Sequence, residues 1–255
     1  KDAAGADFPL VIDGEDVITG EWEAVTCPAD PSFVLGRVAR ARPEEVDRAV
    51  AAARATSASW RATPAARRAQ VLRDAAGLIE ARRYEFAATM VLESAKPWRE
   101  ADGDVAEAID YLRYYSGLAE EMARGPQLVQ VPGEVNTYRY EPRGIAAVIA
   151  PWNFPLAIIT GMTSAALAAG CPAILKPAEQ SPLVAAQLVR VLLEAGVPAG
   201  AVQYLPGPGE AVGRALVEHP QVEVIAFTGS NAVGLSILQA AAVVRPGQRS
   251  VKRVI

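Results

Sequence analysis

From residue 144 onward, short apolar segments alternate with longer segments of helical periodicity, and this alternation constrains the fold most strongly. The apolar segments lack a polar–apolar alternation, as expected for parallel strands covered by helices on both faces. They predict strands at Ile145–Ala150, Ala173–Lys176, Val202–Tyr204 and Val224–Thr228. The remaining segments predict helices at Phe154–Ala169, Pro182–Ala195, Glu210–Glu218 and Asn231–Val243. Right-handed strand–helix–strand units then give an α/β fold, a three-layer doubly wound parallel sheet that binds ligands beyond the carboxyl ends of its strands.

The residues before this region predict smaller strands followed by helices. Strands are expected at Phe8–Ile12, Glu21–Val25 and Leu35–Ala39. Pro43 and the pair Thr63-Pro64 are typical helix starts, and a further helix is expected from about Glu100 to Arg124.

Gly125-Pro126 ends that helical pattern. Gln127–Val131 and Glu134–Glu141, separated by Pro132-Gly133, predict a two-stranded arm whose free edges invite pairing with another chain. We therefore expect three parts: N-terminal strands and helices over residues 1–126, an arm over 127–143, and an α/β core over 144–255.

Composition excludes several classes of partner. A net charge of -4 gives no reason to expect nucleic acid or an acidic membrane surface as a partner. No apolar run approaches the ~20 residues that cross a bilayer, and no signal peptide is visible. Cys27 and Cys171 lie far apart without metal-ligand spacing, so we expect no metal site and a reducing, cytoplasmic location. Both ends read as cuts in a longer polypeptide.

Pro151–Pro155 directly follows a predicted buried strand. One interpretation is a proline-rich turn in which Asn153 caps the next helix. The other uses the Asn153 carboxamide as a donor to a developing oxyanion, a contribution typically worth ~2.7–4 kcal/mol of a reaction barrier.

Lys176–Glu179 closes the next predicted strand. These side chains could be a solvated surface pair, or both could contact a nucleotide. In the second case Lys176 would donate to ribose hydroxyls and Glu179 would accept from them. A carboxylate there repels a ribose 2′-phosphate, which favours NAD over NADP.

Two further loops carry glycine next to a predicted helix. Gly207–Gly213 does not match the Gly-x-Gly-x-x-Gly fingerprint, and it is either a turn or a close approach to a dinucleotide. Phe227–Ser230 ends the last predicted strand, where Ser230 could cap the next helix, donate to a phosphate, or do both. His219 and Cys171 are interpreted as structural residues and not as catalysts.

Taken together, these segments resemble the aldehyde dehydrogenase superfamily over nearly the whole chain. The resemblance implies an NAD-binding, Rossmann-type fold with N-terminal helices and an oligomerisation arm at 127–141, and it identifies Asn153 as the oxyanion-hole asparagine. It also implies a small aldehyde substrate and a homo-oligomer. By the same resemblance the NAD cleft is lined by Ile149, Pro151, Trp152, Lys176, Glu179, Gly209, Gly213, Phe227, Thr228, Gly229, Ser230 and Val233.

A narrower similarity connects the chain with the L-glutamate γ-semialdehyde dehydrogenases of proline breakdown, also called 1-pyrroline-5-carboxylate dehydrogenases. It is carried by Glu93–Trp98, Ala106–Tyr111 and Asn153–Met162. In that subgroup, the residues corresponding to Glu107 and Phe154 lie beside the substrate.

The chain ends where the family would run into its catalytic glutamate and, later, its nucleophilic cysteine. The resemblance therefore implies the NAD-binding part of a dehydrogenase, with the catalytic domain absent and little activity alone. Two alternatives stay open: a non-catalytic dinucleotide-binding or interaction protein of the same fold, and a reductase acting on acyl phosphates.

Overall fold

The computed structural model describes residues 5–255 and is built around one seven-stranded sheet. Its strand order is β10-β9-β6-β7-β8-β2-β3. The bounds are β2 (Leu10–Ile12), β3 (Glu15–Val17), β6 (Ile145–Ile149), β7 (Ala173–Lys176), β8 (Val202–Tyr204), β9 (Val222–Phe227) and β10 (Arg253–Val254). The strands from β10 to β8 run parallel, whereas β2 joins β8 antiparallel and pairs antiparallel with β3.

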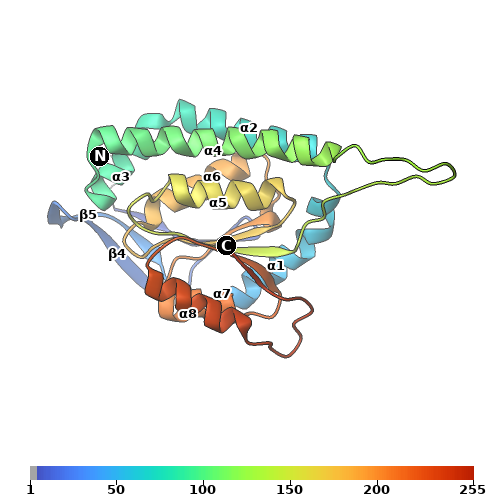
Figure 1. Ribbon diagram of the computed structural model, residues 1–255. Helices are drawn as coiled ribbons and strands as arrows, with labels where there is room; N and C mark the ends of the chain where they lie inside the picture. Colours follow the sequence, from blue (N-terminus) through green and yellow to red (C-terminus); the bar gives the residue numbers. More distant parts are fainter. Residues whose placement is uncertain (1–4) are drawn as a thin grey trace.

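Helices cover both faces of this sheet, as the uniformly apolar strands predict. Figure 1 shows helices on each side of the sheet. On one side, α5 (Ala157–Ala168) and α6 (Pro182–Glu194) lie against the strands, and α2 (Ala65–Ala81) and α4 (Trp98–Arg124) pack over them. The other side contains α1 (Pro43–Ala62), α7 (Arg214–Glu218) and α8 (Asn231–Ala242). Along β6, Val148 packs into the first core and Ala147 and Ile149 into the second, because successive side chains of a strand point to opposite faces.

The N-terminal strands differ from the sequence prediction at Pro9. The predicted strand Phe8–Ile12 is divided there, since β1 (Ala6–Phe8) and β2 belong to different sheets. A proline has no N–H for a strand ladder and readily marks such a break. β1 joins β4 (Trp22–Cys27) and β5 (Asp30–Ala39) in a separate three-stranded sheet.

Several helix bounds also needed correction. A helix α3 (Arg83–Ser94), which the sequence pattern does not predict, lies between α2 and α4. The helix predicted from Phe154 begins only at Ala157, and the one predicted at Glu210–Glu218 is a π-helical turn, Gly209–Gly213, followed by α7. α1 begins at Pro43 as expected.

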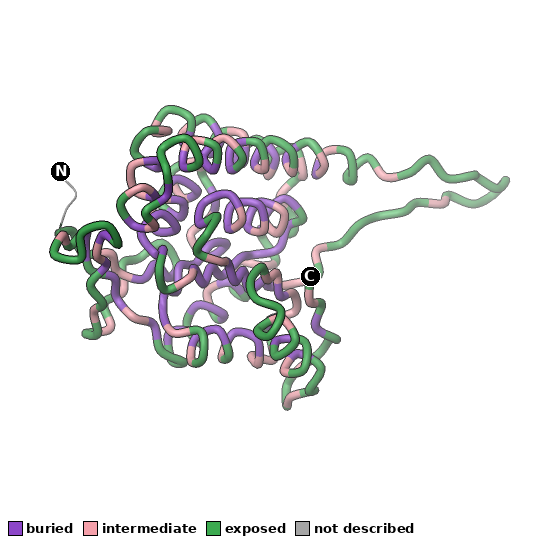
Figure 2. The backbone as a smooth tube through the Cα atoms, turned by 60° about the vertical axis from the view of Figure 1, so that its left-hand side comes forward, coloured by how far each residue is buried: buried purple, intermediate pink, exposed green. Residues whose placement is uncertain are grey.

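Residues 127–143 project as a long arm with mostly exposed residues (Figure 2). The predicted two-stranded ladder is wrong for the chain described here, because none of these residues forms a strand. The limbs are instead joined through the Gln130 side chain, which accepts from Asn136 N at 2.8 Å and donates to Asn136 O at 3.0 Å. An isolated pair of strands is marginal in water, so a ladder needs further support.

Candidate functional site

The loops that carry the predicted site residues gather at one edge of the sheet. β9, β6, β7 and β8 are neighbours in that order and run parallel, so their carboxyl ends lie side by side. Ile149 ends β6, Lys176 ends β7 and Phe227 ends β9. Thr228 N donates to Ile149 O at 3.2 Å and fastens the loop after β9 to the end of β6.

Lys176, Glu179 and Gly209 form a small polar cradle at this edge. The Lys176 side chain is only 6% exposed, and its Nζ lies 3.7 Å from Glu179 Oε1. Glu179 Oε1 also accepts from Gly209 N at 2.8 Å. Burial lowers the pKa of Lys176, and the neighbouring Glu179 charge opposes that shift. Lys176 is therefore not the solvated half of a surface pair.

Glycine at position 209 keeps this cradle open. A Cβ added there would lie 3.6 Å from Glu179 Oε1 and 3.9 Å from Lys176 Nζ, so it would project into the space between them. Gly213 has no such neighbour, because an added Cβ would meet nothing within 4 Å. The geometry thus brings Gly209 to the cradle, while Gly213 is buried at the end of the π-helical turn.

The loop between β6 and α5 presents Trp152, Asn153 and Phe154 to solvent. Asn153 does not cap α5, because the helix begins after Leu156, which provides no side-chain cap. Within residues 5–255 the Asn153 carboxamide has no hydrogen-bond partner, whereas its backbone oxygen accepts from Lys96 Nζ at 2.8 Å. Its side chain is therefore available to a ligand at the sheet edge, beside Pro151.

The segment after β9 combines a close contact with a helix cap. A Cβ at Gly229 would lie 2.6 Å from the Phe227 ring, so a larger residue there would require that ring to shift. Ser230 caps α8 by accepting from Val233 N at 3.3 Å, as one of the two interpretations predicts. Val233 is exposed on the first turn of α8.

Glu107 and Phe154 come from different elements on the same side of the sheet. Glu107 is exposed on α4. Burial of the Tyr111 phenol is the main cause that raises its pKa, and the charge of Glu107 is the second cause. The Phe154 ring lies over Lys96 Nζ, which is 3.9 Å from the ring centroid. Whether both side chains border an aldehyde stays a prediction.

Sequence reasoning gave no role to a buried ion pair beneath this loop. Lys96 Nζ donates to Asp104 Oδ2 at 2.5 Å, and the two side chains are 6% and 0% exposed. The only sequence signal was that Lys96 belongs to Glu93–Trp98, a segment singled out for its resemblance and not for its chemistry.

The interpretation of Cys171 and His219 as structural residues agrees with their surroundings. Cys171 is buried, and burial raises the pKa of its thiol. His219 precedes β9 and so lies at the opposite edge of the sheet, where its Nδ1 accepts from Gln221 N at 3.1 Å. Burial lowers the pKa of His219, more than Asp47 raises it.

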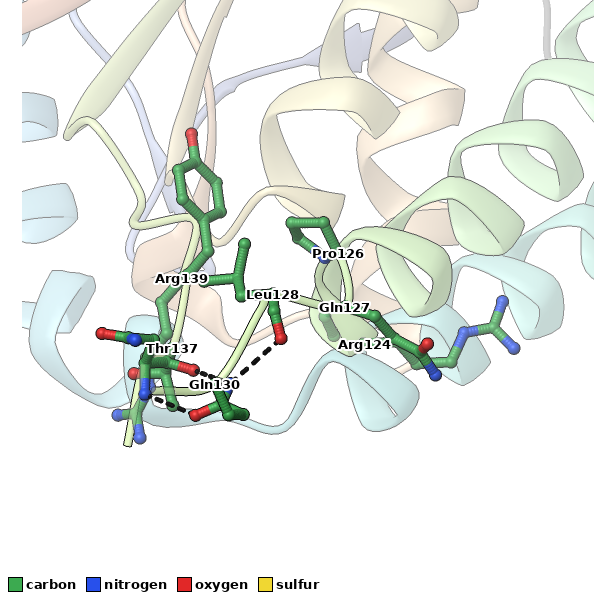
Figure 3. Close-up of a pocket in the computed structure, with 10 residues that line it drawn as sticks. Arg124, Pro126, Gln127, Leu128, Gln130, Thr137 and Arg139 are labelled. Carbon is green, nitrogen blue, oxygen red and sulfur yellow. Dashed lines mark hydrogen bonds between the residues drawn. The ribbon is translucent and has the colours of Figure 1, made fainter. Parts of the chain in front are cut away.

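Two hollows lie away from the polar cradle. One, with a volume of about 600 Å³, lies beside α5 and β9 and includes Met162, Thr228 and Ile255 in its lining. The other lies at the base of the arm, where Figure 3 shows Gln130 between Leu128 and Thr137. No predicted site residue lines this second hollow.

Among the described residues, no helix is long and apolar enough to cross a membrane.

Comparison with known proteins gives consistent results. Residues 18–254 match the model of the aldehyde dehydrogenase family. The 1-pyrroline-5-carboxylate dehydrogenase of Geobacillus thermodenitrificans is 46% identical over 251 residues, which are 98% of this chain and 49% of that protein. The 1-pyrroline-5-carboxylate dehydrogenase 2 of Bacillus subtilis has the same identity and coverage.

Solved structures agree with these sequence matches. The Thermus 1-pyrroline-5-carboxylate dehydrogenase with bound NAD superimposes with a TM-score of 0.97 at 44% identity, covering 99% of this chain and 49% of that one. Proline utilization A from Bdellovibrio bacteriovorus gives a TM-score of 0.96 at 43% identity, covering 98% of this chain and 26% of that one. The chain spans about half the length of the curated relatives it matches.

Proposed function

Because this chain belongs to the aldehyde dehydrogenase family, we propose that it forms the cofactor-binding half of an NAD-dependent enzyme that oxidises L-glutamate γ-semialdehyde to glutamate in proline catabolism. The observation that carries the proposal is the convergence of two loops on one sheet edge. The loop with Asn153 follows β6, and the Lys176–Glu179–Gly209 cradle follows the neighbouring strands β7 and β8. The choice of aldehyde rests on the relatives named 1-pyrroline-5-carboxylate dehydrogenase.

The donor and acceptor set of the cradle fits the adenosine ribose of NAD. The Lys176 ammonium would donate to ribose hydroxyls, and the Glu179 carboxylate would accept from them. Gly209 leaves room between the two groups. The negative charge of Glu179 opposes a ribose 2′-phosphate and thereby favours NAD over NADP. When bound, NAD supplies the acceptor for the hydride of the aldehyde.

Asn153 is proposed to act on the aldehyde itself. Its carboxamide N–H would donate to the oxygen that becomes negatively charged when a nucleophile adds to the carbonyl carbon. A donor of this kind is typically worth ~2.7–4 kcal/mol because it is already oriented before the charge develops. Glu107 and Phe154 are proposed to border the substrate from α4 and from the Asn153 loop.

Neither cysteine of the chain fits the role of the nucleophile. Cys27 and Cys171 are both buried, and the pKa of Cys171 is raised, so its reactive thiolate form is disfavoured. We assign to this half of the protein the cofactor cleft and one oxyanion donor, and to the remainder of the full-length protein the nucleophile and the base.

The first experiment is a calorimetric titration of the full-length protein with NAD and with NADP, comparing wild type with Glu179→Gln. We expect wild type to bind NAD at least about tenfold more tightly than NADP, and the variant to narrow that gap because the repulsive charge is gone. Glu121→Gln, which removes an exposed carboxylate on α4, is the matched control. Equal loss of both affinities in Glu179→Gln would contradict the ribose assignment.

Activity separates the main proposal from its closest alternative. NAD-dependent oxidation of L-glutamate γ-semialdehyde by the full-length protein supports it. Saturable NAD binding without oxidation of any aldehyde would instead identify a dinucleotide-binding protein of the same fold.

The assembly and location are proposed on narrower grounds. We propose that the full-length protein is a homo-oligomer joined through residues 127–141, because these residues project from the body with apolar side chains exposed. A cytoplasmic location agrees with the two free cysteines, since oxidising compartments favour disulfides.

A further inference from the structure

The loop that carries Asn153 is held by the side chain of Lys96, a residue outside this loop. Lys96 lies between α3 and α4, and its Nζ donates to Asn153 O at 2.8 Å. Within residues 5–255, Lys96 is the only hydrogen-bond partner of Asn153. The same ammonium lies under the Phe154 ring, 3.9 Å from its centroid. One cation therefore fixes two consecutive residues of the loop.

Asp104 completes this attachment. It keeps the Lys96 ammonium paired where both side chains are buried, and its other carboxylate oxygen accepts from Ala157 N at 2.6 Å. Ala157 is the first residue of α5, which has no cap from its own N-cap residue. The pair thus holds the loop at Asn153 and the start of the following helix at Ala157.

The position of Lys96 is itself constrained. Ala95 ends α3 in the left-handed conformation with φ 51°, and Pro97 precedes α4. Glu93 of the same junction reaches a different helix, where its carboxyl group accepts from Leu183 N and from Val184 N at the start of α6. Lys96 therefore attaches this junction to the Asn153 loop, whereas Glu93 attaches it to α6. A substitution of Glu93 is a control for a general loosening of the junction.

A buried ion pair is rarely a net source of stability, because removing two charges from water costs about as much as their attraction returns. Here the ion pair instead fixes the position of the loop that carries Asn153. An oxyanion donor helps only when it is oriented before the charge forms, and a shift of about 1 Å can cost roughly a hundredfold in rate.

From these contacts we infer that Lys96, held by Asp104, is a positioning residue for Asn153 in the proposed aldehyde oxidation. The inference rests on the proposed function. In this role Lys96 acts through the Asn153 backbone, whose place it sets and so the direction of the carboxamide, and not by contact with the aldehyde or NAD.

The test is a kinetic double-mutant cycle in the full-length protein, using L-glutamate γ-semialdehyde and saturating NAD. Asn153→Ala should lower kcat by about 10²–10³-fold. Lys96→Met should lower kcat by roughly 10–100-fold with the KM for NAD unchanged. In the Asn153→Ala background, Lys96→Met should change kcat by less than about twofold, because the residue through which Lys96 acts is gone.

Lys96→Met leaves the buried Asp104 charge without its cation and can impair folding. The double variant Lys96→Met/Asp104→Asn removes that charge and keeps an acceptor for Ala157 N, so it should fold and show the same loss of kcat. Lys96→Arg keeps the cation and should recover part of the rate. Glu93→Gln loosens the same junction at α6 and should leave kcat within about twofold of wild type.

A second readout does not need activity. Amide hydrogen exchange should become faster across residues 151–160 in Lys96→Met/Asp104→Asn, and across residues 182–186 in Glu93→Gln. Unchanged exchange at 151–160 overturns the inference. The inference is also overturned if the wild type is active and Lys96→Met lowers kcat by the same factor in the Asn153→Ala background as in wild type. A folded wild type that oxidises no aldehyde overturns the proposed function instead, and exchange alone then decides whether Lys96 holds the loop.

Discussion

Glu93 shows how strongly one buried group can couple this fold to pH. Burial raises its pKa to about 8, although the N–H groups of Leu183 and Val184 oppose that shift. In the unfolded chain the same carboxyl has a pKa near 4.5. The folded protein therefore holds this proton over a pH range in which the unfolded chain has lost it. The contribution is fully present below about pH 4.5 and is lost as the pH rises through about 8.

We predict that Glu93→Gln flattens this part of the pH dependence. The wild-type unfolding free energy should fall by up to roughly 4 kcal/mol more than that of the variant between pH 5 and pH 8. Urea unfolding of the full-length protein at several pH values gives the unfolding free energy of wild type and variant as a function of pH. Subtracting one curve from the other removes the contributions of the other titrating groups. Parallel curves would mean that the two backbone N–H groups keep Glu93 ionised throughout this range.

At the scale of elements, sequence patterns located the parallel strands well and the segments around them less well. β7 and β8 begin and end where predicted, because glycines and prolines bound their short apolar runs. α3 was missed because no glycine or proline separates it from α2. The loops at the strand ends were predictable from topology, whereas the link from Lys96 to Asn153 was not, since those residues lie 57 positions apart.

The N-terminus of α8 allows a prediction that separates two roles of one side chain. Ser230 caps the helix, and it is also proposed to lie beside the cofactor phosphates. Ser230→Ala should cost about 1 kcal/mol of stability by removing the cap. Ser230→Asp should keep the cap, since Asp caps as well as Ser, but weaken NAD binding by at least about tenfold because its charge repels a phosphate.

Thermal melting and NAD titration of the two full-length variants supply the comparison. Wild-type affinity in Ser230→Asp would leave Ser230 as a helix cap alone.

At the scale of the whole molecule, the arm stands out because the rest of this chain does not cover its apolar side chains. Val129 and Val135 are 86% and 88% exposed, and the limbs lack the ladder that their sequence predicts. Apolar side chains held this far from any core gain most by being covered by another surface. An edge without a partner also leaves strand-forming backbone groups free to pair.

We predict that Val129→Asp/Val135→Asp lowers the oligomeric state of the full-length protein. Two charges would be desolvated in the interface, while the exposed arm of a free subunit would tolerate them. Ile18→Asp, at an isolated position that is 68% exposed, is the matched control and should leave assembly unchanged. Sedimentation velocity over a range of concentrations measures the mass of each variant. If Val129→Asp/Val135→Asp keeps the wild-type mass, the contact between subunits lies elsewhere and the arm needs another explanation.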